Sequence, residues 1–259
     1  MFHSLFRLTH IQPIVGAKMP ERTRRDVKQV GKKATLEVAV YRHIFDAILE
    51  FKLAPGTRLK EEELTEIFDV SRTIIRAALG RLHHEGVVEM IPNKGAFVAN
   101  PNIDDAKQIL EARRLIELAV VERAVDQRVE IGKGFDILRD MVELEHQKSQ
   151  SGDKGGALRL SGEFHLRLAE FCGNAPLSGF LRSLVPQTSL IIALYQVSEG
   201  KQCSIDEHFE LVEAIENGEK EKAVQLMGVH LDHIESRLSF TSRPTSSSLA
   251  EIFSNARLS

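Results

Sequence analysis

The sequence VSRTIIRAALGRL at residues 70–82 decides the fold of the N-terminal part of the chain. Its apolar side chains recur every three or four residues, which predicts a helix that buries one face. The buried face consists of Ile75, Ala78, Leu79 and Leu82. Ser71 favours the start of a helix and Gly86 favours its end, so we expect the helix to lie between these two residues.

The exposed face of this helix has side chains suited to reading DNA. A helix in the major groove needs long hydrogen-bonding side chains near its N-terminus, where base edges come within reach. Arg72 and Arg76 lie one turn apart and can donate paired hydrogen bonds, with Ser71 and Thr73 beside them. Arg81 is expected to lie toward the DNA backbone. Arginines on any solvated helix look similar, so the interpretation depends on the surrounding segments.

Those segments fit a DNA-binding domain. Helical patterns at 36–50 and 61–68 precede the helix, and β-prone runs at 87–91 and 96–99 follow it. Three helices followed by a hairpin predict a winged helix-turn-helix over residues 34–100. The turn between the two strands includes Lys94 and Gly95, which form a small, positive tip suited to the minor groove or to phosphates.

The rest of the chain shows only helical patterns, so the fold class is mainly α, with an all-α bundle over residues 101–240. Asp104 or Asp105 is expected to cap its first helix. We expect this domain to bind a ligand and to form a homodimer, because one winged helix has too few base contacts and two-fold proteins read pseudo-palindromic DNA. The predicted helices cover 104–128, 133–150, 154–173, 176–198, 204–217 and 219–240.

Three histidines of this domain lie in amphipathic helical patterns: His165, His208 and His230. All three could point into the bundle interior, where neutral imidazoles bind divalent ions such as Zn²⁺ or Ni²⁺. A histidine in such a pattern, taken alone, is more often a hydrogen-bonded structural residue than a metal ligand. The sequence therefore leaves a metal site and three structural histidines as alternatives.

Composition bounds the class of protein and its compartment. The net charge is −3, yet residues 1–33 contain 8 basic and 2 acidic side chains, which predicts a basic flexible arm. Translation could instead start at Met19. Residues 241–259 are rich in Ser and Thr at their start and are expected to be a flexible tail. Two cysteines and the lack of an uninterrupted apolar run of membrane-spanning length favour a cytoplasmic protein with no membrane partner.

The N-terminal part resembles the GntR family of winged-helix regulators over residues 36–99. The matching segments are 54–59, 63–64, 70–73, 76–79, 82 and 85–88. The resemblance implies that Ser71, Arg72, Thr73 and Arg76 contact DNA and that Gly95 lies at the minor groove. Ile74-Ile75 departs from the usual Pro-Val and Ala77 from an expected Glu, and Lys60 occupies the usual serine cap position.

Residues 103–240 are similar to the FadR-type ligand-binding domain of the same family. In metal-binding members, histidines matching His165, His208 and His230 join an aspartate four residues before the first. An arginine matching Arg113 helps to hold an organic acid. Ser161 occupies the aspartate position here, which removes an anionic ligand, while Glu163 points to another face of the helix.

The sequence thus predicts a DNA-binding transcriptional regulator that is controlled by a small carboxylate. We expect a repressor, because repression is the commoner mode of regulation. That ligand would bind near Arg113 and Ser161, with or without a metal. Two alternatives are a metal-dependent enzyme built on the three histidines, and a DNA-binding protein that has structural histidines and no effector. An enzyme has less support, because no nucleophile motif or phosphate-binding loop accompanies the histidines.

Overall fold

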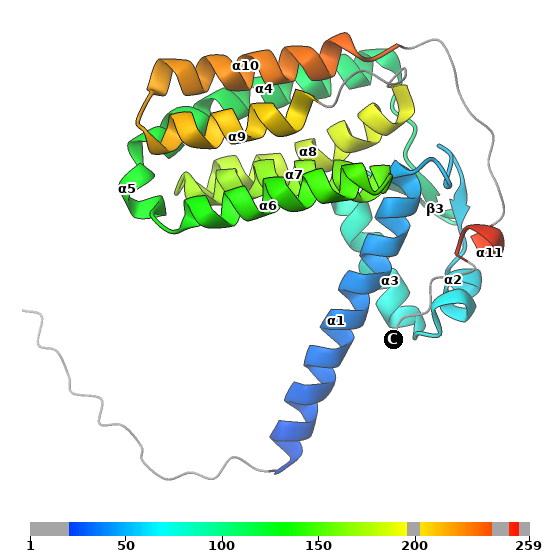
Figure 1. Ribbon diagram of the computed structural model, residues 1–259. Coiled ribbons are helices and arrows are strands. Elements are labelled where there is room, and N and C mark those ends of the chain that lie inside the picture. The colour runs from blue at the N-terminus through cyan, green and yellow to red at the C-terminus, as the bar shows by residue number, and fades with distance from the viewer. Residues whose placement is uncertain (1–20, 196–202, 240–248, 254–259) are drawn as a thin grey trace, which may run out of the picture. The chain divides into compact units, whose positions relative to one another are not determined.

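The computed structural model describes residues 21–195, 203–239 and 249–253. The chain divides into two units, residues 1–35 and residues 36–259. Helix α1 (Glu21–Leu49) provides the described part of the first unit and begins the second. The second unit contains both the DNA-binding domain and the helical domain (Figure 1).

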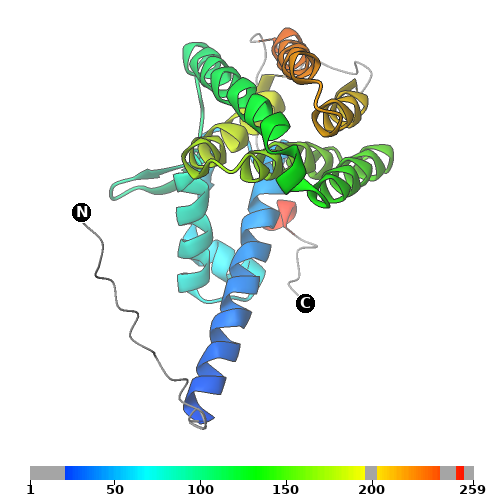
Figure 2. The ribbon, with the colours of Figure 1, turned by 90° about the vertical axis from the view of Figure 1, so that its left-hand side faces the viewer.

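The DNA-binding domain is a winged helix, as the sequence predicts. After α1 come β1 (Arg58–Leu59), α2 (Glu61–Phe68), α3 (Arg72–His84), β2 (Val88–Ile91) and β3 (Gly95–Val98). The three strands form an antiparallel sheet in the order β1-β3-β2, with Arg58 opposite Phe97. The β2–β3 hairpin lies next to α3 (Figure 2). The predicted stripe Ile75, Ala78, Leu79 and Leu82 is buried in the core.

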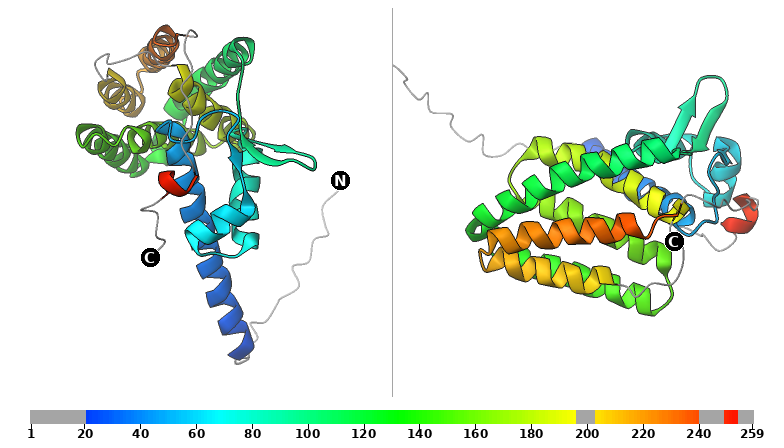
Figure 3. Two further views of the ribbon diagram at one scale, coloured as in Figure 1. Left: turned by 90° about the vertical axis from the view of Figure 1, so that its right-hand side faces the viewer. Right: turned by 90° about the horizontal axis from the view of Figure 1, so that it is seen from above.

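Within its described residues, the helical domain contains six long helices that pack against one another in a ring. Their bounds are α4 (Ile103–Asp126), α6 (Gly134–Gln150), α7 (Lys154–Phe171), α8 (Ala175–Tyr195), α9 (Cys203–Glu216) and α10 (Lys220–Ser236). Helix α4 packs on α8, α8 on α7, α7 on α6, α6 on α9, α9 on α10, and α10 again on α4 (Figure 3). A short helix, α5 (Arg128–Ile131), which the sequence analysis missed, connects α4 to α6. Side chains that point inward from this ring share one core.

Helix α7 joins the two domains of the second unit. The Arg159 guanidinium donates to Asp46 of α1 over 2.7 Å and to Glu163 of its own helix over 2.9 Å. The backbones approach closely, because a β-carbon at Gly155 would lie only 3.2 Å from the backbone oxygen of Asp46. The helix that contributes His165 to the interior therefore also contacts the winged helix.

Both predicted flexible ends differ in part from the structure. Residues 21–33 belong to helix α1, so this part of the predicted arm is helical, while residues 1–20, with Met19, lie outside the described residues. Residues 249–252 form α11, and Leu249 and Phe253 are buried in the core of the winged helix. The Phe253 ring lies 5.1 Å from that of Phe68 in α2. Apolar burial therefore orders part of the predicted tail.

The helix caps also correct the sequence analysis. Ser71 occupies the N-cap position of α3, yet its side chain forms no capping hydrogen bond. Asn102, and not Asp104 or Asp105, caps α4. The Asn102 side chain accepts from the Asp105 backbone over 2.9 Å, and the Asp105 carboxylate accepts from the Asn102 backbone over 3.1 Å. Asp105 is thus the reciprocal partner in a capping box.

Helix α8 is the one helix among the described segments that is long and apolar enough to cross a membrane by length and composition alone. It includes Arg182 and Pro186, and it packs against α4 and α7 within the ring. Its buried residues include Leu181, Val185, Leu190 and Ile191. Its apolar character is accounted for by its place in the core of the helical domain.

Replacement of Asn102 should destabilise the start of the helical domain. We expect Asn102→Ala to lower the free energy of unfolding by about 1 kcal/mol, because the two reciprocal hydrogen bonds at the start of α4 are lost. Urea denaturation followed by circular dichroism measures the change. Asn100→Ala, at an exposed position in the same linker, is the matched control and should have an effect below about 0.5 kcal/mol. Equal effects of the two variants would refute the capping role.

Candidate metal centre and nucleic-acid interface

The three predicted histidines meet inside the helical ring. His165 of α7, His208 of α9 and His230 of α10 are each at most 2% exposed. One nitrogen from each ring lies within 4.8 Å of the others. The Nε2 atoms of His165 and His208 are 3.3 Å apart. Within the described part of the chain, Nε2 of His230 is the one buried side-chain nitrogen or oxygen without a hydrogen-bond partner.

Each of these histidines contacts a carboxylate through its other ring nitrogen. The Nδ1 atom of His165 lies 2.6 Å from Glu117, that of His208 lies 3.0 Å from Glu145, and that of His230 lies 2.7 Å from Glu207. A carboxylate at Nδ1 favours a proton there, which leaves a lone pair on Nε2. The second oxygen of Glu207 lies 2.6 Å from His233. The lone pairs of the three buried rings therefore converge on one point.

Burial keeps two of the three imidazoles neutral. It lowers the pKa of His165 to about 4 and that of His230 to about 3, despite the carboxylate beside each ring. Neutral imidazole is the form that ligates metals. Near pH 7 these two rings are therefore in the protonation state that a metal site requires.

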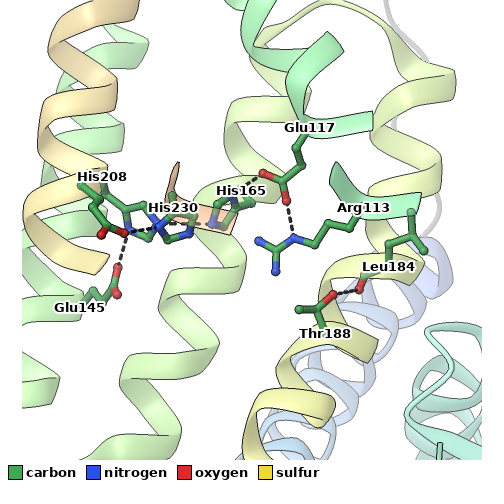
Figure 4. A network of polar contacts seen from close by, with 9 residues as sticks. Arg113, Glu117, Glu145, His165, Leu184, Thr188, His208 and His230 are labelled. Carbon is green, nitrogen blue, oxygen red and sulfur yellow. Dashed lines mark hydrogen bonds and ion pairs between the residues drawn. The ribbon is translucent and has the colours of Figure 1, made fainter. Parts of the chain in front are cut away.

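Arg113 extends this network by one more step. Its Nε atom donates to Glu117 over 2.5 Å, and Glu117 in turn contacts His165 (Figure 4). Both Arg113 and Glu117 are at most 2% exposed. Burial would raise the pKa of Glu117, but Arg113 and His165 outweigh it and hold this pKa well below its usual range. A buried guanidinium thus lies one carboxylate away from the histidine cluster.

Sequence reasoning missed Glu145, although a signal was present. Leu138 and Val142 of α6 are buried, and Glu145 continues their helical spacing. A glutamate in an apolar stripe needs a buried partner, because an unpaired charge in a protein interior is costly. That partner is His208, 63 residues further along the chain. The remaining predicted site residue of this domain, Ser161, is half-buried on α7, one turn before His165.

The predicted DNA-contacting side chains are exposed on the winged helix. Ser71, Arg72, Thr73 and Arg76 are exposed at the start of α3, and Lys94 and Gly95 are exposed at the turn of the hairpin. Asn93 and Gly95 both have positive φ, which a tight turn requires. The two arginines pair with the start of α2: Arg72 with Glu62 and Arg76 with Glu61, each over 2.8 Å.

Arg81 has a different environment from the one expected. Its guanidinium lies 3.9 Å above the ring of Tyr41 and donates to Glu85 over 2.9 Å. Glu85 also accepts a 2.5 Å hydrogen bond from the Tyr41 hydroxyl, and burial raises the pKa of that hydroxyl. The structure therefore gives Arg81 a role in packing α3 against α1, whereas the sequence predicts a place toward the DNA backbone.

Comparison with known proteins assigns a family to the winged helix and to the helical domain separately. A family model described as bacterial regulatory proteins, gntR family, matches residues 36–98, and an FCD domain model matches residues 108–233. The Nta operon transcriptional regulator of Aminobacter aminovorans is 27% identical over 187 residues, which cover 71% of this chain and 85% of that protein. The regulator LutR of Bacillus subtilis (strain 168) is 29% identical over 212 residues, which cover 73% of this chain and 94% of LutR.

A solved structure shares the fold. The E. coli protein McbR/YncC superposes with a TM-score of 0.65 at 20% identity, over 78% of this chain and 95% of that protein. This likeness supports the fold of the described chain. The chain belongs to the GntR family of bacterial regulatory proteins and has an FCD domain at its C-terminal side.

Proposed function

We propose that this GntR-type regulator is a sensor in which the helical domain binds a divalent metal and a small carboxylate, and in which that ligand changes the affinity of the winged helix for DNA. One observation supports the proposal above all others. Three buried imidazoles turn Nε2 toward one another while each Nδ1 contacts a carboxylate. This is the arrangement in which proteins orient histidines for a metal.

The donor set fits a divalent cation such as Zn²⁺ or Ni²⁺. Three neutral imidazoles suffice for zinc sites that keep open positions, and the buried Nε2 of His230 lacks a partner that such an ion would provide. When bound, the ion supplies positive charge and open positions for an anionic ligand. His165, His208 and His230 would hold it, while Glu117, Glu145 and Glu207 orient the rings.

Arg113 is the residue that would recognise the carboxylate. Its bond to Glu117 uses Nε, and the two terminal nitrogens of the guanidinium point away from that carboxylate (Figure 4). Terminal guanidinium nitrogens form the paired bonds by which arginine binds carboxylates. Ser161 occupies the position four residues before His165, where its hydroxyl could orient a metal-bound water or the ligand.

Helix α7 offers a direct route from this site to the DNA-binding domain. It contributes His165 to the cluster, and Arg159 on the same helix binds Asp46 of α1. A ligand that prefers one position of α7 would favour one placement of the winged helices in a dimer, and so change DNA affinity. We propose a homodimer that reads a pseudo-palindromic operator in the cytoplasm and acts as a repressor.

The proposed metal site predicts that the parent protein and its variants differ in metal content. Protein purified without a histidine tag should contain substoichiometric metal by elemental analysis. His208→Ala should contain none, and Glu145→Gln should bind zinc about 10- to 100-fold more weakly, because the ring of His208 loses its orienting partner. Ser161→Asp should contain more metal than the parent, because an anionic ligand is restored.

The control for this series is His84→Ala, at an exposed position of α3, which should leave the metal content unchanged. Metal-free parent protein that also fails to take up added zinc or nickel would contradict the site. The three histidines would then be structural.

Arg113 predicts carboxylate binding. Removal of Arg113 alone would leave Glu117 buried without its cation, at a cost of about 3–5 kcal/mol, so Arg113→Ala is combined with Glu117→Gln. Acids that raise the melting temperature of the parent are first found by thermal shift. Calorimetry should then show that the double variant binds them about tenfold or more weakly than Glu117→Gln alone. Equal affinities would assign Arg113 to structure.

The recognition helix predicts a loss of sequence-specific binding. Arg72→Ala and Arg76→Ala should each weaken binding to a duplex selected by the parent protein from a random library by about 1–3 kcal/mol, because paired contacts to bases are lost. Fluorescence anisotropy measures the affinity. Arg182→Ala removes the same charge from an exposed position of α8 and should have little effect. Full retention of specific binding by both α3 variants would defeat the assignment.

A further inference from the structure

We infer that Glu61, the first residue of α2, is a specificity-determining residue that positions the DNA-reading Arg76, and that Glu61 and its neighbour Glu62 both weaken binding to DNA of the wrong sequence. The inference rests on the proposed reading of DNA by α3. Neither glutamate was predicted to take part in DNA recognition, and both carry the charge that a DNA phosphate repels.

Two ion pairs join the start of α2 to the exposed face of α3. Glu61 accepts from Nε of Arg76, and Glu62 accepts from a terminal nitrogen of Arg72, each over 2.8 Å. Consecutive residues of α2 thus reach arginines that are one turn apart on α3. The side chain of Arg76 is 65% exposed and that of Glu61 is 30% exposed, so the arginine lies farther toward solvent than the carboxylate behind it.

These pairs contribute little to folding. Exposed ion pairs are worth between about 0 and 1 kcal/mol, and the winged helix already has a fully buried apolar core. The first turn of α2 accommodates acidic side chains in any case, because the helix dipole favours them there. The energetic consequence of Glu61 and Glu62 is therefore expected in the DNA complex and not in the stability of the domain.

The two pairs use different nitrogens. Glu61 accepts from Nε of Arg76, whereas Glu62 accepts from a terminal nitrogen of Arg72, which must leave Glu62 before both terminal nitrogens can read a guanine. The bond to Glu61 uses Nε of Arg76, so it does not occupy the two terminal nitrogens that pair with O6 and N7 of guanine. Arg76 can therefore read a guanine while Glu61 still holds it. An arginine that swings toward a phosphate must break its ion pair and leave a carboxylate facing the backbone, where like charges repel.

The experiment compares DNA of two kinds at several salt concentrations. The full chain and its Glu61→Gln and Glu62→Gln variants are titrated by fluorescence anisotropy against the duplex selected by the parent protein and against a scrambled duplex of equal length and composition. Each variant should bind the scrambled duplex about twofold to fivefold more tightly, the size of one exposed ion pair. In Glu61→Gln, binding to the selected duplex should tighten less, so the ratio of the two affinities falls. Glu62→Gln releases a terminal nitrogen of Arg72 and should tighten binding to both duplexes.

Two further readouts exclude a general charge effect. Glu66→Gln removes the same charge from an exposed position of α2 and should leave the ratio unchanged. The salt dependence of scrambled-duplex binding should become steeper by about one phosphate contact in Glu61→Gln and Glu62→Gln, because a released arginine can bind a phosphate. Thermal unfolding should be the same for all three variants.

The possible failures are distinguishable. An unchanged affinity ratio in Glu61→Gln, or an equal fall in Glu66→Gln, would overturn this inference while the parent protein still discriminates between the duplexes. A parent protein that binds both duplexes equally would overturn the proposed reading of DNA by α3, and this inference with it.

Discussion

The pairing of buried charges is the constraint on which the helical domain depends. Arg113, Glu117 and Glu145 lie in its interior, where each would be costly without a partner. Arg113 contacts Glu117 on the same helix, α4, and Glu117 contacts His165 of α7. His165 in turn contacts His208 of α9, and His208 contacts Glu145 of α6. The ring of His230, on α10, lies 4.7 Å from that of His208 and brings α10 into the same network. An apolar core could hold these helices together, but only the polar network specifies where three imidazole lone pairs meet.

The same constraint explains how the site could be sensitive to a ligand. Among the residues that the structure describes, Nε2 of His230 is buried without a hydrogen-bond partner, so a cation would complete the network there. A carboxylate that binds the terminal nitrogens of Arg113 would share that guanidinium with Glu117, whose other oxygen contacts His165. His165 and Arg159 share helix α7, and Arg159 binds Asp46 of the winged helix. Few contacts separate the proposed metal and acid sites from the winged helix, which favours coupling between them.

Features set by neighbouring residues could be predicted from the sequence, whereas features set by distant partners could not. The amphipathic spacing of α3 and the turn before β3 are local patterns, and both were confirmed. Strand β1 is only two residues long and is defined by its pairing with β3, so no local pattern indicated it. Residues 21–33 are too polar to suggest a packed helix, and the burial of Phe253 depends on Phe68.

The proposed site follows the same division. The histidines were predicted from family resemblance and helical periodicity, but the role of Glu145 depends on a partner 63 residues away.

The most direct test of the account is the affinity of the full chain for its selected duplex in three states: metal-free, zinc-loaded, and zinc-loaded with an acid identified by thermal shift. The account predicts that the acid changes the dissociation constant of the zinc-loaded protein by about fivefold or more, the usual range of allosteric coupling, and that His208→Ala abolishes the change. One dissociation constant in all three states, with zinc and acid both bound, would contradict it.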